Sequence, residues 1–307
     1  MSQWLLSMMS PDIPERLRRF EIPGRVTLLE GNGDLVMVEV TSDWATAEIY
    51  LHGAHVTGFQ KKGEPPLLFT SQCSRFAPGQ PIRGGIPIIF PWVGPREGSP
   101  AHGYARTTEW ELHEATTVPD GGVSLRFSFP GNPEGAMWTA FAANYVVTVT
   151  DTLRLELILT NASDRQDLSI ENCLHTYFAV GDIAGAVVCG LKGVNYLDKV
   201  EHFAPKRETA DQLAITSEVD RIFVDTITPV EIHDRSLGRR IVIEKSGSVS
   251  TVVWNPWVTK AQQMTDFGNE EYKKMLCVES GNIGGNKLVL PPGKSSVLSV
   301  VLSSQPL

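Results

Sequence analysis

Short apolar runs recur along this chain, and the clearest of them alternates apolar with polar positions. Leu153, Leu155, Leu157 and Leu159 fall on one face of an extended segment, while charged residues point the other way. This period of two predicts a half-buried β-strand. Comparable strand signals occupy residues 34–40, 123–129, 143–150, 153–160 and 296–303. Asp151-Thr152 is expected to close a tight hairpin between two of these strands.

Clusters of Gly, Pro, Asn and Asp separate the runs, as β-turns require. Helix signals are confined to residues 11–20 and to a turn or two within 206–213. Many short strands without helical crossovers indicate an antiparallel sandwich or barrel. We therefore predict an all-β fold with few short helices. A single β domain is expected over residues 26–307, with an N-terminal extension (1–25) packed on it.

Composition excludes several classes of function. The chain has 307 residues, is 42% hydrophobic and carries a net charge of −8, which is unfavourable for a nucleic-acid-binding surface. No run of eighteen apolar residues occurs, so no membrane span is expected. The cysteines are widely spaced, as reduced thiols in a cytoplasm are: Cys73, Cys173, Cys189 and Cys277. We expect a cytoplasmic monomer that binds neither nucleic acid nor membrane.

Motifs for common cofactors fail on their spacing. The segment "PPGKSS" ends like a phosphate-binding P-loop, but Leu288 stands where its first glycine belongs. His52 and His55 are three residues apart, and on a strand such residues point to opposite faces. No GxSxG elbow is present for a serine nucleophile. We expect neither a metal ion nor a cofactor.

The segment "ENCLHTYF" (171–178) sets His175 in a predicted buried strand. The opposite face of that strand carries large apolar side chains: Ile170, Leu174 and Phe178. The face of His175 carries polar or ionisable groups: Glu171, Cys173 and Tyr177. From this segment alone, a hydrogen-bonded core histidine is the simpler interpretation, and a catalytic histidine is the alternative.

Two other segments supply candidate partners. "KKMLCVESGNIGG" (273–285) has the pattern of a strand that stops at Glu279, where partial desolvation would raise the carboxyl pKa. In "PIRGGIPIIFPWVGP" (81–95), two glycines follow Arg83, which lets a guanidinium fork approach a phosphate or carboxylate. The plainer alternatives are a solvent-facing glutamate and a tight turn with a capped arginine.

The ordered segments "PIRGGIPIIFPWVG", "AHGYAR", "LHTYF", "VDRIF", "WNPW" and "CVESGNI" resemble the aldose 1-epimerase superfamily. The similarity is greatest to its glucose-6-phosphate 1-epimerase (hexose-6-phosphate mutarotase) branch and covers nearly the whole chain. It implies a galactose-mutarotase-like antiparallel β supersandwich. It also implies an isomerase that interconverts the α and β anomers of a hexose 6-phosphate, foremost D-glucose 6-phosphate, without a cofactor.

The resemblance also implies site residues. His175 matches the catalytic acid and Glu279 the catalytic base. The matching substrate-binding positions are Arg83, Arg106, His102 and Asp220. Ala101 departs from the pattern, because some members of the family have glutamine there, so the preferred hexose does not carry over.

A Glu–His pair suits anomer interconversion near neutral pH, particularly where the surroundings raise both pKa values. Two other functions remain open: an aldose 1-epimerase for unphosphorylated hexoses, and a non-catalytic sugar-binding protein on the same fold. A glycoside hydrolase ranks last, because it would need two carboxylates flanking one bond. Only Glu279 stands out, with Asp220 a poor second.

Overall fold

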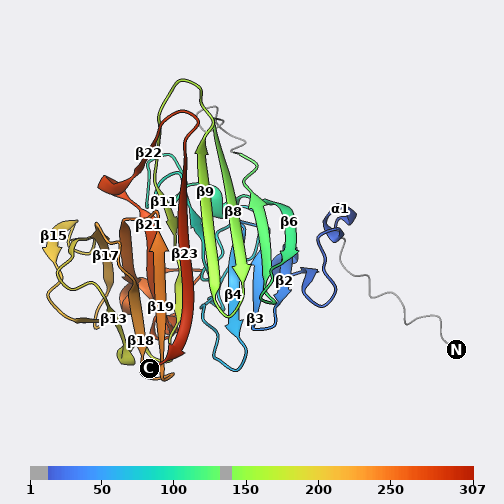
Figure 1. Cartoon of the computed structure of the whole chain (residues 1–307). Coiled ribbons are helices and arrows are strands. Elements are labelled where there is room, and N and C mark those ends of the chain that lie inside the picture. Colours follow the sequence, from blue (N-terminus) through green and yellow to red (C-terminus); the bar gives the residue numbers. More distant parts are fainter. Residues whose placement is uncertain (1–12, 132–139) are drawn as a thin grey trace.

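The predicted strands form in the computed structural model, which describes residues 13–131 and 140–307. Within these residues every paired strand is antiparallel, and the helices are few and short (Figure 1). The predicted all-β antiparallel fold is confirmed.

The largest sheet has nine strands and contains the alternating leucine strand. In spatial order they are β16 (Gln212–Ala214), β13 (Ala186–Cys189), β18 (Val230–Asp234), β19 (Arg239–Ser246), β23 (Ser295–Pro306), β9 (Leu153–Asn161), β8 (Phe141–Val149), β7 (Val123–Ser128) and β6 (Glu111–Thr117). The four leucines of β9 are completely buried, as the period of two predicts. Val149 pairs with Leu153, so the predicted hairpin between β8 and β9 is confirmed.

A sheet of eight strands carries the candidate site residues. Its strands are β15 (Ala204–Arg207), β14 (Asn195–Asp198), β17 (Val219–Val224), β20 (Ser250–Asn255), β21 (Met275–Asn282), β11 (Asn172–Leu174) and β5 (Ile88–Ile89), with β12 (Tyr177–Ala179) also paired to β21. The predicted strand around His175 is therefore interrupted, because β11 ends before this residue and β12 begins after it.

The remaining strands form two small sheets. They are β1 (Val26–Glu30), β2 (Val36–Thr41), β3 (Ala45–Tyr50) and β4 (His55–Lys61) in one, and β10 (Leu168–Ile170) with β22 (Leu288–Leu290) in the other. The helices are α1 (Glu15–Arg18), α2 (Trp257–Gln263) and the 3₁₀ turns η1 (Asn32–Asp34), η2 (Ala105–Thr107), η4 (Ile183–Gly185), η5 (Glu271–Lys274) and η6 (Gly284–Asn286).

The helix predictions were only partly right. The helix expected over 11–20 is the single turn α1, and its first two residues lie outside the described range. Leu17 of α1 is buried in the main core. The prediction of a helical turn within 206–213 is wrong, because strand β15 extends to Arg207 and strand β16 begins at Gln212. Helix α2 was not predicted, since the "NPW" sequence that begins it reads as a turn.

The two faces of the eight-stranded sheet differ in what covers them. Leu174, Phe178 and Leu276 belong to the main apolar core, together with the inward residues of the nine-stranded and four-stranded sheets. Cys173 and Tyr177 project into a second, smaller core on the other face. The two faces predicted for residues 170–178 are thus confirmed, and His175 lies beside the smaller core.

Candidate active site

A cavity of about 290 Å³ opens beside that smaller core. Such a volume is near the lower end of the roughly 300–1,000 Å³ found for small-molecule pockets. It is lined by Arg83, Val93, Gly94, Pro95, His102, His175, Tyr177, Lys199, Asp220, Ile222, Val252, Trp254, Lys260, Met264 and Glu279. Five of the six predicted site residues are among them. Arg106 is not.

Neighbouring backbone holds His175 in place at the gap between β11 and β12. Its N–H donates to the carbonyl of Pro87 over 3.0 Å, and the N–H of Tyr177 donates to Gly85 over 2.9 Å. The imidazole stacks on the Tyr177 ring, with centroids 4.8 Å apart, and meets Trp254 edge-on. The ring is therefore oriented on both sides, and its Nδ1 atom is buried without a hydrogen-bond partner.

Glu279 lies in the middle of a strand, so the prediction that its strand stops there is wrong. Strand β21 continues to Asn282, and Glu279 pairs with Val252 of β20. Because the strand has neighbours on both sides, the residue is only 3% exposed. Burial, with a smaller contribution from Asp220, raises the carboxyl pKa to about 8. The raised pKa was predicted, but its cause is central burial rather than the exit of a strand.

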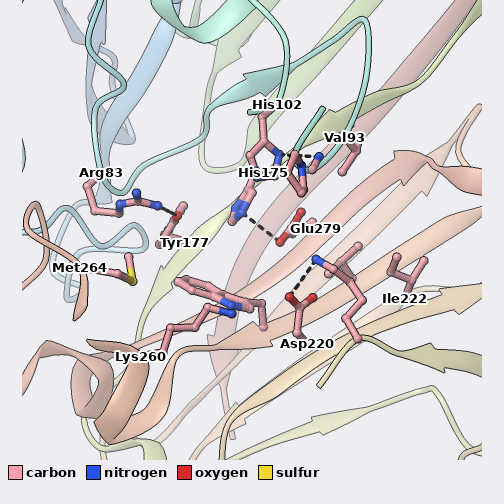
Figure 2. A pocket seen from close by; sticks show the side chains of 15 residues that line it. Arg83, Val93, His102, His175, Tyr177, Asp220, Ile222, Lys260, Met264 and Glu279 are labelled. Carbon is pink, nitrogen blue, oxygen red and sulfur yellow. Dashed lines mark hydrogen bonds and ion pairs between the residues drawn. The ribbon is translucent and has the colours of Figure 1, made fainter. Parts of the chain in front are cut away.

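The two predicted catalytic groups touch each other. His175 Nε2 and Glu279 Oε1 are 3.2 Å apart, and the side chains point toward one another across the cavity (Figure 2). The sequence-based expectation that both pKa values rise is wrong for His175. Burial lowers its pKa well below 6.5, and His102, Arg106 and Arg83 lower it further. In the free site these shifts favour a protonated Glu279 carboxyl beside a neutral imidazole, so the pair shares one titratable proton.

The glycines after Arg83 form the tight turn that the sequence indicated. Gly84 has φ +121°, and a Cβ on it would lie 2.4 Å from the Cα of Thr70. Its carbonyl accepts a 2.8 Å hydrogen bond from His55 Nε2, so His55 has a structural role. The turn places Arg83 at the cavity wall, where all three guanidinium nitrogens donate hydrogen bonds. Nε and Nη2 donate to Asp266, and Nη1 donates to the hydroxyl of Tyr177.

Arg106 and His102 lie together at the edge of the site. The Arg106 guanidinium donates to the carbonyl of Ala101 over 2.9 Å, and its Nε is buried without a partner. Burial and the nearby charge of Arg83 lower its pKa to about 10. Burial, followed by Arg106, lowers the pKa of His102 to about 3. Since Gly94 N–H donates to His102 Nδ1, the neutral ring carries its proton on Nε2.

On the Glu279 side of the cavity, Asp220 forms an ion pair with Lys199 at 2.8 Å (Figure 2). Its second oxygen, Oδ1, is buried without a partner and is available to accept a hydrogen bond. Lys260 also lines the cavity and pairs with Glu218, and sequence reasoning missed it. Lys260 lies on α2, the helix that was not predicted.

Comparison with known proteins identifies the family. The model for aldose 1-epimerases matches residues 37–303. The chain belongs to the aldose 1-epimerase family. A Cenchrus ciliaris protein named "Putative glucose-6-phosphate 1-epimerase" is 33% identical over 269 residues, which cover 85% of this chain and 82% of the relative. The expected class of enzyme, a carbohydrate isomerase, is confirmed.

Solved structures agree with this assignment. A Salmonella typhimurium protein described as a "putative mutarotase (YeaD)" matches with a TM-score of 0.85 at 28% identity, over 93% of this chain and 95% of that one. A galactose mutarotase-like protein from Clostridium acetobutylicum matches with a TM-score of 0.69 at 14% identity, over 92% and 98% of the two chains. The predicted galactose-mutarotase-like fold is confirmed. Within residues 13–131 and 140–307, no helix is long and apolar enough to cross a membrane.

One group of side chains in the epimerase has the spacing of metal ligands. Potential ligand atoms of His175, Cys277 and Glu279 all lie within 4.8 Å of one another. A metal ion would need the thiolate of Cys277 and the carboxylate of Glu279. Burial, together with Glu279, raises the pKa of Cys277 well above 9, and burial raises the pKa of Glu279 to about 8, so both groups favour their protonated forms. The donor chemistry therefore fits a proton-transfer pair better than a metal site.

A buried thiol also contacts Glu279. Cys173 Sγ donates to Oε2 over 3.4 Å, which leaves Oε1 to face His175. This donor lowers the pKa of Glu279 against the larger effect of burial. The S–H group therefore steadies the carboxylate form of Glu279.

We expect Cys173→Ala to move the Glu279-dependent limb of the pH–rate profile to higher pH, by less than about one unit, because a thiol is a weak donor. Cys173→Ser restores a donor and should reverse the shift. Cys277→Ala is the matched control, since this thiol donates no hydrogen bond to Glu279 in the described structure. Equal shifts in the Cys173→Ala and Cys277→Ala enzymes would contradict this account.

Proposed function

We propose that this epimerase interconverts the α and β anomers of a hexose 6-phosphate, with D-glucose 6-phosphate as the preferred substrate. The observation that carries the proposal is the contact between His175 and Glu279 inside a cavity with cationic side chains. A purely sugar-binding protein has no need for a buried pair that shares one proton.

Anomer exchange requires two proton transfers at each ring opening. The C1–O5 bond breaks as O5 receives a proton, while the C1 hydroxyl loses its proton and the C1=O1 double bond forms. Rotation about C1–C2 and the reverse transfers close the ring on the other face. We assign Glu279, as the carboxylate, to be the base at O1, and His175, as the imidazolium, to be the acid at O5. The proton that Glu279 holds in the free site is therefore on His175 when ring opening begins. The pair supplies one proton and accepts one, so it returns to its initial state after each cycle.

The phosphate of the substrate fits the side of the cavity near His175. Among the described residues, no carboxylate lies within 4 Å of the Arg106 guanidinium, whereas Arg83, Lys199 and Lys260 all have acidic partners. A partly buried cation without an ion-pair partner favours binding of an anion. The ring oxygen O5 is attached to C5, which carries C6 and its phosphate. A phosphate near Arg83 and Arg106 would therefore direct O5 toward His175.

Anomer exchange on phosphorylated and free sugars tests the substrate. We expect kcat/KM for glucose 6-phosphate to exceed that for glucose by on the order of 10²-fold or more, because the phosphate contributes charge-assisted hydrogen bonds to arginine. Equal values would favour an aldose 1-epimerase for free hexoses. Saturable binding without faster exchange would favour a sugar-binding protein.

Arg106→Gln should raise the KM for glucose 6-phosphate at least about tenfold and change kcat less, because a lost charge-assisted hydrogen bond costs about 1.5–3 kcal/mol. KM for unphosphorylated glucose should be nearly unchanged. Arg126→Gln is the matched control, since Arg126 lies on β7 and contacts Glu114. An unchanged KM for the phosphorylated sugar would remove Arg106 from the phosphate site.

We further propose that the enzyme acts as a cytoplasmic monomer with a single domain over residues 26–307, on which the described part of the N-terminal extension, residues 13–25, packs. Two observations support this. All four cysteines are unpaired, as in a reducing compartment. Ile13, Leu17 and Phe20 contribute buried side chains to the main core.

A further inference from the structure

The surroundings of His175 contain an excess of positive charge in the free enzyme. The charge of Arg83 is matched by Asp266 at 3.0 Å, but the guanidinium of Arg106 has no acidic partner among the described residues. Both arginines act on His175 and disfavour its imidazolium form. The cavity therefore holds the catalytic pair in the wrong charge state for a histidine acid.

The other groups that face His175 do not compensate for this charge. Tyr177 stacks on the imidazole, and burial raises its pKa to about 12, so its hydroxyl stays neutral. His102, whose ring centroid is 5.9 Å away, is neutral as well. Trp254 carries no charge. Among the residues that the structure describes, only Glu279 forms an ion pair with His175, across the 3.2 Å contact through which a proton can be exchanged.

Farther along the cavity, the charges are already balanced. Lys199 is paired with Asp220, and Lys260 with Glu218. The thiols of Cys173 and Cys277 are buried, and burial and Glu279 raise the pKa of each. An added anion would therefore have its largest effect beside the two arginines, near His175.

We propose that an oxyanion bound beside Arg83 and Arg106 moves the shared proton from Glu279 to His175, an inference that rests on the proposed function. The enzyme then has a second activity: it anomerises aldoses that lack a phosphate when a free phosphate-like dianion is bound. In the proton shift, the O–H bond of the Glu279 carboxyl breaks and an N–H bond forms at His175 Nε2. No other bond changes, and the dianion stabilises the resulting imidazolium.

Coulomb's law supports the size of this effect. The dianion raises the pKa of both His175 and Glu279, so only the difference between these two effects moves the proton. Arg83 lies on the side of His175 away from Glu279 (Figure 2), so a dianion there is nearer the imidazole. At an effective dielectric constant of about 20, a dianion about 5 Å from the imidazole and about 8 Å from the carboxyl favours the imidazolium by roughly two pKa units. The phosphate of the substrate would thus activate the acid as well as orient the sugar. A separate dianion should reproduce the activation without a covalent link to the sugar.

The test uses D-xylose, which is the glucose ring without C6, together with sodium phosphite. Enzyme-dependent anomer exchange is measured by NMR, after subtraction of the enzyme-free rate at each phosphite concentration, because phosphite itself catalyses mutarotation. We expect kcat/KM for xylose to rise saturably, on the order of tenfold or more, with phosphite. The rise should disappear in Arg106→Gln and persist in Arg126→Gln.

A second measurement separates charge transfer from orientation. In ¹⁵N-histidine-labelled enzyme without sugar, the signals of His175, assigned by their loss in His175→Asn, should titrate at least one pH unit higher with saturating phosphite. Competition with glucose 6-phosphate reports phosphite binding independently. Phosphite that binds without raising xylose turnover overturns the proposal, and so does an unchanged His175 titration or an absence of binding. Turnover of glucose 6-phosphate in the same preparation shows whether the proposed function itself stands.

Discussion

Replacing Glu279 by glutamine is expected to lower enzyme-catalysed anomer exchange by about 10²–10⁴-fold, the usual contribution of one positioned acid or base. The amide keeps the size and the central place of the side chain in β21, but it can neither hold nor release the shared proton. Exchange of glucose 6-phosphate anomers measured by NMR, corrected for the spontaneous rate, reports the loss. Glu244→Gln, an exposed exchange of the same kind on β19, is the control.

The stability of the same variant shows whether the loss is chemical. The folded-state pKa of Glu279, about 8, lies above its ordinary value of 4.5. The protonated carboxyl therefore stabilises the fold fully below about pH 4.5, and this contribution is lost as pH rises to about 8. Glutamine does not ionise and so loses no stability in this range. The free energy of unfolding of the variant, relative to that of wild type, should therefore increase between pH 5 and 8 by on the order of a few kcal/mol. An inactive variant that also unfolds at every pH would contradict a purely catalytic role.

His175→Asn should cause a loss of similar size, about 10²–10⁴-fold, because asparagine keeps a polar side chain at the cavity wall but does not transfer a proton at neutral pH. The effect should fall mainly on kcat, since the phosphate contacts remain. His233→Asn, on β18 beside Glu231, is the matched control. A variant with near-wild-type kcat would remove His175 from the mechanism.

If His175 and Glu279 act as a pair, the losses of activity in the two single variants should not be independent. Because His175 and Glu279 exchange one proton, either replacement alone disables the cycle. The double variant should therefore be only slightly slower than the poorer single variant. Multiplied effects, with the double variant losing the product of both factors, would indicate two groups that act independently.

Most of the fold could be predicted because its strands carry a local signal. The leucine alternation of β9 is buried as predicted, and the two faces of 170–178 separate into two apolar cores. Local patterns were insufficient at boundaries. Strand β21 continues past Glu279 through Ser280, Gly281 and Asn282, residues with weak β propensity, because strands on either side pair with it.

The candidate site residues were predicted from sequence motifs, which carry no information on the distances between side chains. Five of its six predicted residues line one cavity, although they come from parts of the chain far apart in sequence. The electrostatics could not be read from the sequence. The lowered pKa of His175 depends on burial and on arginines whose partners are set only by the folded chain. Likewise, only the folded structure shows that, among the described residues, no carboxylate comes within 4 Å of the Arg106 guanidinium while Asp266 pairs with Arg83.

Anomer-exchange NMR on glucose 6-phosphate, with wild type, Glu279→Gln and His175→Asn compared at equal concentration, tests the central claim most directly. The account predicts exchange cross-peaks between the α and β H1 signals that intensify with wild-type enzyme and return nearly to the enzyme-free level with each folded variant. Wild-type enzyme that leaves the exchange rate unchanged, or either variant that matches wild type, would contradict it.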